Sequence, residues 1–468
     1  MKKSQQQHSS SVNANMEKWL TIVSVSFISL VAFETLAVAT AMPFVVEILH
    51  GEHLYALAAG ITLATQLTTT ALAGKWCDAK GPRQCLMAGL SLFAAGLIIA
   101  TAAPTIEVLV LGRAVQGFGG GLIIVPLYVF VGNYIHPSRQ PRVFASFAAA
   151  WVLPSLIGPF IAGLFVDHLH WRLVFGFVPA CLILVIPILA RLLRRFPPLH
   201  DPLPFTGLTR ILTLACGTGV CIAALQIISG IKTTTFSYLL IGAIIALSVL
   251  AFICVRPLLP RGTLLAQPGL GASVAMRGIL NGTYIAVEVY LPLMLKNLHG
   301  WNPTQAGLIM TTGAVTWALG SWVQGRITSP ELRRQLPILG PILQLFGTLL
   351  TLCAASPSLP GILAVFGWLI AGFGTGLIYP ALTVHALALT ELSEHGIVSS
   401  AISIMDSMGA ALFVAYAGII FAILASWGLW AYASVIISMS IILVAALWVG
   451  LRVDMGRTSS PSQIQSEK

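Results

Sequence analysis

The sequence has very few charged residues for its length. Of 468 residues, 9% are Asp, Glu, Lys or Arg and 57% are hydrophobic, whereas a soluble domain carries roughly 25% charged residues. The mean hydropathy is correspondingly high, at +0.90. This composition excludes a soluble globular protein and predicts a membrane protein with many transmembrane segments.

Cysteine spacing typical of metal sites or disulfide frameworks is also lacking. The seven cysteines include no C-x-x-C pair, and most lie in apolar runs, so neither a structural disulfide network nor a metal site is indicated. No cofactor is expected. The N-terminus is polar, and no cleavage-type segment precedes the first long apolar run. We therefore expect a short cytosolic tail and no removed signal peptide.

Apolar stretches dominate what is present, and fourteen of them are long enough to cross roughly 30 Å of hydrocarbon. Six come first, at residues 19–43, 54–73, 84–103, 108–132, 143–166 and 171–190. Two follow a basic, proline-broken connector, at 211–230 and 238–254. Six more complete the chain, at 271–295, 305–324, 337–355, 360–388, 397–425 and 429–449. These stretches predict an all-α polytopic membrane protein with 14 transmembrane helices.

The basic residues are distributed unevenly between the connectors. With both termini in the cytosol, 20 of the 25 Lys and Arg fall in cytosolic segments, and three fall outside, at Arg172, Lys232 and Lys296. Arg113 and Arg277 lie inside spans. This bias follows the positive-inside rule. It places the net charge of +10 at the lipid surface, so no nucleic-acid partner is required.

Two pairs of short segments repeat along the chain. GFGGGLI at 117–123 returns as GFGTGLI at 372–378, and GKWCD at 74–78 returns as GSWVQ at 320–324. The repeat pairs the first six spans with the last six. Duplicated halves with a site near the midplane are a recurrent plan of secondary transporters. We expect tails at 1–18 and 451–468, six-helix bundles at 19–190 and 271–450, and connectors with two inserted helices at 191–270.

Four stretches carry recognisable motifs. ETLAVATAMP from residue 34 resembles D-x-T-x-x-x-x-A-x-P, GKWCDAKGPRQ from 74 resembles G-x-L-x-D-R-x-G-R-[RK], GRAVQGFGGG from 112 resembles R-x-x-Q-G-x-G-x-G, and PSLIGPFIAG from 154 resembles G-x-x-x-G-P-x-x-G-G. Ala79 replaces the usual arginine of the second motif. Together they resemble the major facilitator superfamily, and especially its fourteen-helix drug:proton antiporter branch. The resemblance implies two six-helix halves with two inserted central helices.

Glu34 and Arg113 are the first candidates for proton coupling or substrate recognition. Each lies within a predicted span, where a charged side chain costs on the order of 2.5–3.5 kcal/mol. A carboxyl removed from water favours its neutral form, so Glu34 can take up and release protons. The resemblance places Arg113 at a position tied to proton coupling. The alternatives are structural: Glu34 bonds a hydroxyl of Thr35 or Thr40, and Arg113 bridges helices or reaches the headgroups.

Polar residues in other spans are further candidates. Glu288 and Asp406 lie in spans of the second half, and each is expected either to take part in coupling or to hold helices together. Arg277 is expected to face the cytosolic headgroups, with pairing to either acid as the alternative. Gln66 and Gln116 are candidate hydrogen-bonding residues of a cavity. A set of aromatic residues could line it for hydrophobic or cationic molecules: Tyr128, Tyr284, Tyr290, Trp317 and Tyr379.

A conformational switch is implied by two of the motifs. The Asp78 carboxylate would pair with Arg83, or cap a neighbouring helix, in one conformation and release it in the other. Gly158 and Pro159 are expected to break the fifth helix where it faces the other half, with a permanent kink as the alternative. The predicted switch residues are Gly74, Asp78, Gly81, Arg83, Gly158 and Pro159.

These features predict a proton-coupled secondary transporter that exports small hydrophobic or cationic compounds by alternating access. A proton-coupled symporter that imports a metabolite on the same fold is the alternative. A membrane enzyme would need a polar cluster, and the best one, Asp167 with His168 and His170, is explained more simply by helix-end hydrogen bonds. A receptor that no longer transports is a third possibility. We expect a monomer in the cell membrane, with both termini cytoplasmic, whose partners are its substrate, protons and lipid.

Overall fold

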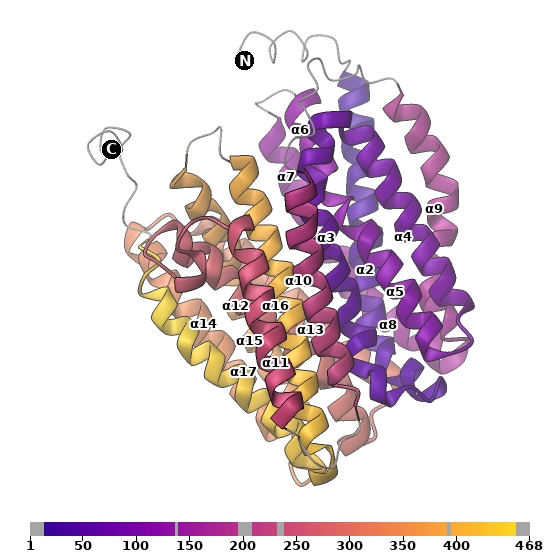
Figure 1. The fold of residues 1–468 in the computed structure, drawn as a ribbon, viewed down its shortest axis with the longest axis vertical. Coiled ribbons are helices and arrows are strands. Elements are labelled where there is room, and N and C mark those ends of the chain that lie inside the picture. The colour runs from indigo at the N-terminus through magenta and orange to yellow at the C-terminus, as the bar shows by residue number, and fades with distance from the viewer. Residues whose placement is uncertain (1–13, 136–138, 195–207, 232–237, 391–394, 455–468) are drawn as a thin grey trace. The chain divides into compact units, whose positions relative to one another are not determined.

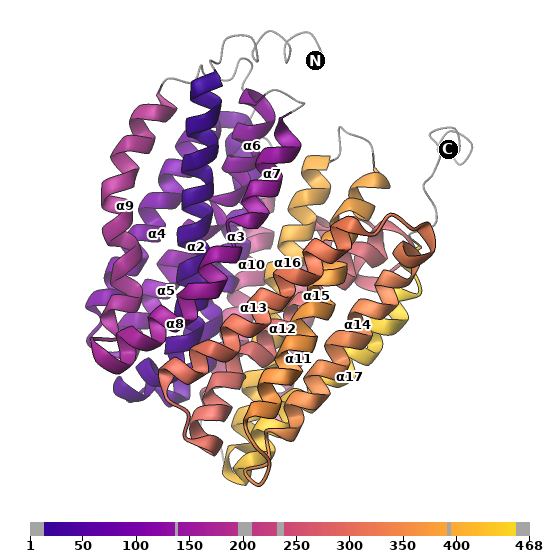
Figure 2. The same ribbon diagram turned by 180° about the vertical axis from the view of Figure 1, so that it is seen from behind.

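The computed structural model describes residues 14–135, 139–194, 208–231, 238–390 and 395–454. Within these ranges, thirteen helical segments are long and apolar enough to cross a membrane, and Val152–His168 is a shorter apolar helix. The predicted class, an all-α polytopic membrane protein, is confirmed. Figures 1 and 2 show the helices from opposite sides.

The chain divides into two compact units. Unit 1 comprises Met1–Val220 and Asn302–Thr311, and unit 2 comprises Cys221–Trp301 and Thr312–Lys468. The predicted domain boundaries at residues 190 and 271 stay a prediction. Unit 1 contains α2 (Ala14–Ile48), η1 (Glu52–Leu54), α3 (Tyr55–Lys80), α4 (Pro82–Ala102), α5 (Ile106–Gly121), α6 (Ile124–Tyr134), α7 (Gln140–Ala149), α8 (Val152–His168) and α9 (Arg172–Leu193).

Two helices contribute residues to both units, namely α10 (Leu208–Ile228) and α13 (Pro303–Arg326). The remaining helices belong to unit 2. They are α11 (Tyr238–Val255), η2 (Arg256–Leu258), η3 (Thr263–Leu265), α12 (Leu270–His299), α14 (Pro330–Cys353), α15 (Ile362–Ala388), α16 (His395–Leu424), η4 (Ala425–Trp427) and α17 (Leu429–Gly450). Proline opens α4, α13 and α14, where its missing N–H leaves no helical bond unmade.

The same pattern of helix pairs occurs in both units. In unit 1, α5 packs on α4, α8 on α2, and α9 on α4 and α2. In unit 2, α15 packs on α14, α16 on α12, and α17 on α14 and α12. The pairing of α14 with α17 is visible from both sides of the molecule (Figures 1 and 2). The sequence repeat therefore corresponds to a repeat of packing.

The repeated glycines make this packing possible. A Cβ added to Gly117 or Gly121 of α5 would overlap backbone atoms of α3, and one added to Gly372 or Gly376 of α15 would overlap backbone atoms of α13. The middle glycine of each run meets α4 or α14 instead. Small residues allow such close approach between membrane helices. The glycine runs are thus helix-packing elements.

Two predicted helices are interrupted by prolines. In each, the proline lies four residues after a backbone carbonyl that would otherwise accept a helical hydrogen bond. The fourth span consists of α5 and α6, and the fifth consists of α7 and α8. Pro126 and Pro154 have no N–H to donate to the carbonyls of Leu122 and Ala150. The Cys85 thiol lies 3.9 Å from the Leu122 carbonyl oxygen, and the Ser29 hydroxyl donates to that of Ala150 at 2.9 Å. Side chains from neighbouring helices therefore compensate both breaks.

The fifth helix does not break where the sequence predicted. Gly158 and Pro159 lie inside α8, which continues through both residues. The interruption lies earlier, at Ala150 and Trp151, because Pro154 removes a helical bond there. Gly158 itself meets Phe33 of α2, whereas the Pro159 carbonyl lies against Gly307 of α13, a helix of the predicted second half.

Candidate functional site

A buried arginine–glutamate pair of unit 1 joins the middle of α2 to the middle of α5. Arg113 Nη1 donates to Glu34 Oε1 at 2.6 Å, and the two side chains are 8% and 3% exposed. The same nitrogen donates to Gln116 Oε1 at 2.8 Å. Gln116 lies one turn after Arg113 on α5, which places both side chains on the face toward α2. The structure thus brings together three of the candidate residues, and their role in coupling or recognition stays a prediction.

The structural alternatives for Glu34 do not hold. The Thr35 hydroxyl donates to the Val31 carbonyl, and the Thr40 hydroxyl donates to that of Leu36. Both hydroxyls are therefore occupied within α2, and the partner of Glu34 is Arg113. Neither member of the pair reaches water, so the charges compensate each other in a low-dielectric interior.

The unit 1 pair is only partly satisfied. The Nε of Arg113 is buried and has no hydrogen-bond partner among the described residues. Buried donors without a partner are uncommon in folded proteins. Gln66 does not supply the missing bond: it is half-buried on α3 and its side chain lies along Gly120 of α5. One donor of Arg113 is therefore left without an acceptor among the described residues.

Unit 2 contains a second, largely buried ion pair, with side chains 10% and 18% exposed, which is much more fully bonded. Arg277 of α12 donates from Nε to Asp406 Oδ1 at 3.2 Å and from Nη2 to Asp406 Oδ2. Its Nη1 donates to the Tyr379 carbonyl at 3.0 Å and to the Thr383 hydroxyl at 2.7 Å. The guanidinium also lies 3.4 Å from the centre of the Tyr379 ring. The planar guanidinium of arginine is well suited to bidentate pairing with a carboxylate and to stacking on an aromatic ring.

The favoured expectation for Arg277 is therefore wrong. It does not face the headgroups: it is 8% exposed and pairs with Asp406. Position along the chain could not select this partner, because 129 residues separate the two. The available signal was the depth of Arg277 within its predicted span, where an unpaired cation is expensive. Thr383 has no comparable signal and was missed.

The aromatic residues that were candidates for lining one cavity lie in different parts of the structure. Tyr284, Trp317 and Tyr379 form one group in unit 2, with ring centres 5.0 Å apart for the first two and 5.1 Å apart for the last two. Trp368, which the sequence did not single out, stacks on Tyr284 at 4.4 Å. Tyr128 is instead 48% exposed on α6.

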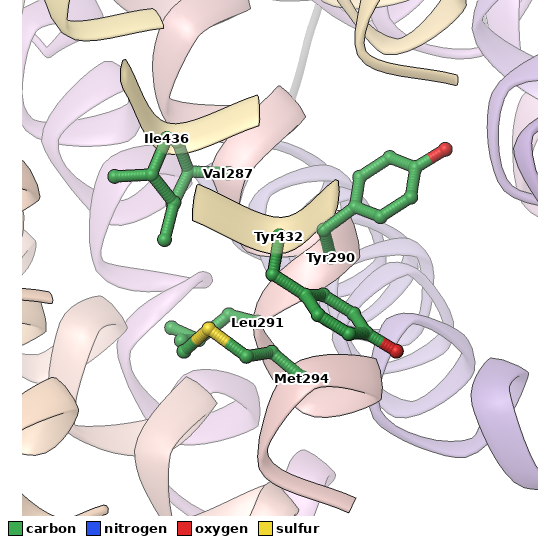
Figure 3. Close-up of a pocket in the computed structure, with 6 residues that line it drawn as sticks. All are labelled: Val287, Tyr290, Leu291, Met294, Tyr432 and Ile436. Atoms are coloured by element: carbon green, nitrogen blue, oxygen red, sulfur yellow. The ribbon is translucent and has the colours of Figure 1, made fainter. Parts of the chain in front are cut away.

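Tyr290 lines a small apolar cavity of about 10 Å³, together with other residues of α12 and two of α17. Figure 3 shows the residues around it: Val287, Tyr290, Leu291, Met294, Tyr432 and Ile436. Drug-sized ligands occupy roughly 300–1,000 Å³. This cavity is too small to be the substrate site.

The predicted switch residues are only partly described. Gly81 has a φ of 83° and ends α3, and α4 begins at Pro82. Gly74 lies within α3, and Arg83 is exposed in the first turn of α4. The side chain of Asp78 lies outside the described residues, so its pairing with Arg83 stays a prediction.

The polar cluster considered for a membrane enzyme has a structural role. Asp167 Oδ2 accepts hydrogen bonds from the backbone N–H and the hydroxyl of Thr304, in the first turn of α13. His170 Nδ1 accepts from the backbone N–H of Arg172 at 3.2 Å. These are helix-end bonds of the kind expected. In the described part of the chain, no three His, Cys, Asp or Glu residues could hold a metal ion.

Comparison with known proteins agrees with this architecture. The family model of the Major Facilitator Superfamily matches residues 22–264, which is more than half of the chain. The chain belongs to this superfamily. A major facilitator protein is a membrane transporter and not an enzyme, and the similar curated proteins are named accordingly. The multidrug transporter protein MdtP of Bacillus subtilis is 26% identical over 81% of this chain and 70% of its own length.

Other relatives carry similar names. A probable multidrug-efflux transporter of Mycobacterium tuberculosis is 25% identical over 86% of this major facilitator chain and 87% of its own. Among solved structures, a bacterial homologue of the lysosomal transporter Spinster has a TM-score of 0.70 at 14% identity, covering 96% of this chain and 100% of that one. A peptide transporter has a TM-score of 0.68 at 15% identity, covering 96% and 98%. These structures support the fold alone.

Proposed function

We propose that this transporter is a proton-coupled exporter of small hydrophobic or cationic compounds, of the fourteen-helix drug:proton antiporter type. The observation that carries the proposal is the buried, partly satisfied Glu34–Arg113 pair of unit 1. The names of the similar transporters, which include multidrug transport and efflux, favour export over the import of a metabolite.

Proton coupling requires an acid whose charge can change inside the membrane. Protonation of Glu34 removes its charge and breaks the ion pair, because a neutral carboxyl no longer compensates Arg113. Arg113 then needs another acceptor, and Gln116 already accepts from the same nitrogen at 2.8 Å. The Arg113–Gln116 bond therefore keeps the arginine partly satisfied while Glu34 carries a proton.

The same reasoning makes Asp406 a poor proton carrier. Both of its oxygens accept from Arg277, and releasing them would leave a guanidinium that is also fixed by Thr383 and by the Tyr379 ring. Protonation there would disrupt several contacts at once. We assign coupling to unit 1 and a structural role to the Arg277–Asp406 pair.

The proposed cycle is an exchange by alternating access. Glu34 takes up a proton from outside and releases it to the cytosol, and the change in its charge favours one conformation over the other. A proton moving inward across the full potential supplies about 2.3 kcal/mol per 100 mV. The excess of basic residues in the segments expected to be cytosolic favours an orientation with both termini in the cytosol.

The direction of coupled flow tests the proposal. Purified transporter is reconstituted in vesicles, a pH gradient is imposed, and movement of a fluorescent lipophilic cation such as ethidium is followed. Export predicts that the cation and the proton move in opposite directions, and that collapsing the gradient with an ionophore stops the flow. Movement of substrate and proton in the same direction would identify a symporter, and specific binding without movement would identify a receptor.

A further inference from the structure

The connector between α11 and α12 is a folded segment with two different faces. It comprises residues 256–269 and includes η2 and η3. Leu259 and Ala266 are buried in unit 2, whereas Leu264 and Leu265 are exposed, the latter to 71%. The segment therefore turns a pair of leucines outward at a place where a connector is expected to leave the hydrocarbon.

The end of α17 holds this connector in place. Arg452 Nη1 donates to the carbonyls of Leu265 and Ala266, each at 3.3 Å. The Arg452 carbonyl in turn accepts from the backbone N–H of Gly269 at 3.1 Å. Leu451, the residue before Arg452, is 70% exposed. The exposed leucines of the connector and of α17 thus lie at the same end of unit 2.

The end of α13 and the start of α14 belong to this end as well. One buried cluster contains Ala266 of the connector, Val453 after α17 and Leu336 of α14, and Ile327, which follows α13, packs against it. Arg333 Nε of α14 also donates to the Ile327 carbonyl at 2.9 Å. Side-chain packing and hydrogen bonds therefore join the ends of several helices into one surface.

The charge of this surface is strongly positive. Its segments, residues 256–269, 322–336 and 448–454, contain two acids, Glu331 and Asp454, and no lysine. They contain six arginines: Arg256, Arg261, Arg326, Arg333, Arg334 and Arg452. A guanidinium offers paired N–H donors that match two oxygens of a phosphate, whereas a lysine offers only a compact charge. The composition of the surface therefore favours phosphate groups as partners.

Two tryptophans mark the depth of this surface. The guanidinium of Arg326 lies 3.4 Å from the centre of the Trp322 ring, and that of Arg452 lies 3.5 Å from the centre of the Trp448 ring. Both tryptophans are more than half exposed. Tryptophan is enriched where hydrocarbon meets the lipid headgroups, so these pairs place the arginines at headgroup level.

Neither water nor a soluble anion suits both kinds of side chain. Either would solvate or pair the arginines and would leave Leu264, Leu265 and Leu451 in water. Apolar side chains of interfacial segments insert into the boundary between headgroups and acyl chains, and basic side chains beside them attract anionic headgroups. An anionic phospholipid supplies the phosphate and the acyl chain together.

We propose that residues 256–269, 322–336 and 448–454 form a binding surface for anionic phospholipids, which we call the lipid-binding end of unit 2. Its arginines contact headgroup phosphates, and its exposed leucines contact the acyl chains. With the C-terminus in the cytosol, the lipid belongs to the cytosolic leaflet. The surface gives the connector after the two inserted helices a role as an anchor, and it depends neither on proton coupling nor on the direction of transport.

A competition between two phospholipids tests the surface. The full-length protein is released from mixed micelles that contain equal amounts of phosphatidylglycerol and phosphatidylcholine, and native mass spectrometry counts the lipids that stay bound. We expect phosphatidylglycerol to be retained about fivefold or more over phosphatidylcholine. The triple variant Arg256→Gln, Arg261→Gln, Arg334→Gln should lower this preference to about twofold or less. A wild-type preference in the triple variant would overturn the proposal.

A matched triple variant separates this surface from net charge. Arg142→Gln, Arg191→Gln, Arg194→Gln removes three exposed arginines from unit 1 and should keep most of the preference. Equal losses in the two triple variants would show that only total charge matters, which would contradict a binding surface on unit 2. Arg333 and Arg452 are left unchanged because they bond backbone carbonyls, so the variants keep the packing of this end.

The leucines and a soluble headgroup separate lipid from free anion. The double variant Leu264→Gln, Leu265→Gln leaves every arginine in place and should lower the amount of phosphatidylglycerol retained. Glycerol 1-phosphate, added at the same concentration as the lipid, should not displace it. Full retention by the leucine variant, or displacement by glycerol 1-phosphate, would identify an anion site without lipid recognition and refute the proposal.

Discussion

The two units each bury one arginine–carboxylate pair, but they bond it differently. In unit 1, Glu34 accepts through one oxygen from one nitrogen of Arg113, and the Nε of Arg113 has no partner among the described residues. In unit 2, Arg277 engages both oxygens of Asp406 as well as a hydroxyl, a carbonyl and an aromatic ring. The first pair can change its charge with few other losses. The second cannot, and the proposal that one pair serves coupling and the other stability rests on this difference.

The helices that hold these pairs are nearly equivalent. The glycines of α5 and α15 pack against the corresponding helices of their own units, and the helix pairs repeat. The functional difference therefore does not arise from the scaffold. It arises from a few side chains that differ between the repeats. When GFGGGLI at 117–123 is aligned with GFGTGLI at 372–378, Arg113 aligns with Trp368, which is fully buried and stacks on Tyr284.

The largest expected effect comes from removing the titratable group of unit 1. Glu34→Gln should reduce proton-driven efflux in vesicles to the level of protein-free vesicles, because an amide cannot carry the proton. Exchange of substrate across vesicles without a gradient should persist. Glu107→Gln, which alters an exposed acid of the same unit, is the control. Proton-driven efflux by Glu34→Gln at the wild-type rate would refute the assignment of coupling to unit 1.

Breaking the unit 2 pair should instead affect stability. Arg277→Ala leaves Asp406 buried without its partner, which typically costs about 3–5 kcal/mol. The measurement is thermal unfolding of the detergent-purified protein. The double variant Arg277→Gln with Asp406→Asn should recover part of the loss, since neither side chain is then charged. If the double variant is as unstable as Arg277→Ala, the buried charge is not the cause.

Glycine substitutions should affect the two units equally. Gly121→Ala in α5 and Gly376→Ala in α15 each force a methyl group into a facing backbone, and such overpacking costs about 1–3 kcal/mol. Gly242→Ala in α11 meets open space and should be neutral or slightly stabilising. Unfolding midpoints of the three variants provide the comparison. A large difference between the first two would break the equivalence of the scaffolds.

The smallest expected effect tests the interruption between α7 and α8. Ser29→Ala removes the hydroxyl that donates to the Ala150 carbonyl, and the loss of one such bond costs about 0.5–1.5 kcal/mol. Ser26→Ala is the matched control, because the Ser26 hydroxyl bonds only its own helix, at the Ile22 carbonyl. Equal unfolding midpoints for the two variants would show that the interhelical bond does not stabilise unit 1.

Several local features were predictable because they depend on short stretches of sequence. Apolar length predicted the helices, and Gly and Pro marked many of their ends. The fifth helix shows the limit of this approach. Pro154 and Pro159 are both residues that can interrupt a helix. The helix is interrupted before Pro154, at Ala150 and Trp151, whereas α8 continues through Pro159. Which proline interrupts a helix depends on whether a neighbouring helix can bond the freed carbonyl, as Ser29 does.

The sequence by itself determined that this chain is a duplicated, all-helical membrane transporter, because hydropathy, charge bias and repeated glycine motifs are properties of local segments. It also indicated Glu34 and Arg113, because charge within an apolar span is conspicuous. Only the tertiary structure decided the partners. It paired Arg277 with Asp406 and left Glu288 beside Tyr284 and its neighbouring rings. Helix packing selects the partners of buried charges across separations of 79 and 129 residues, which no local pattern encodes.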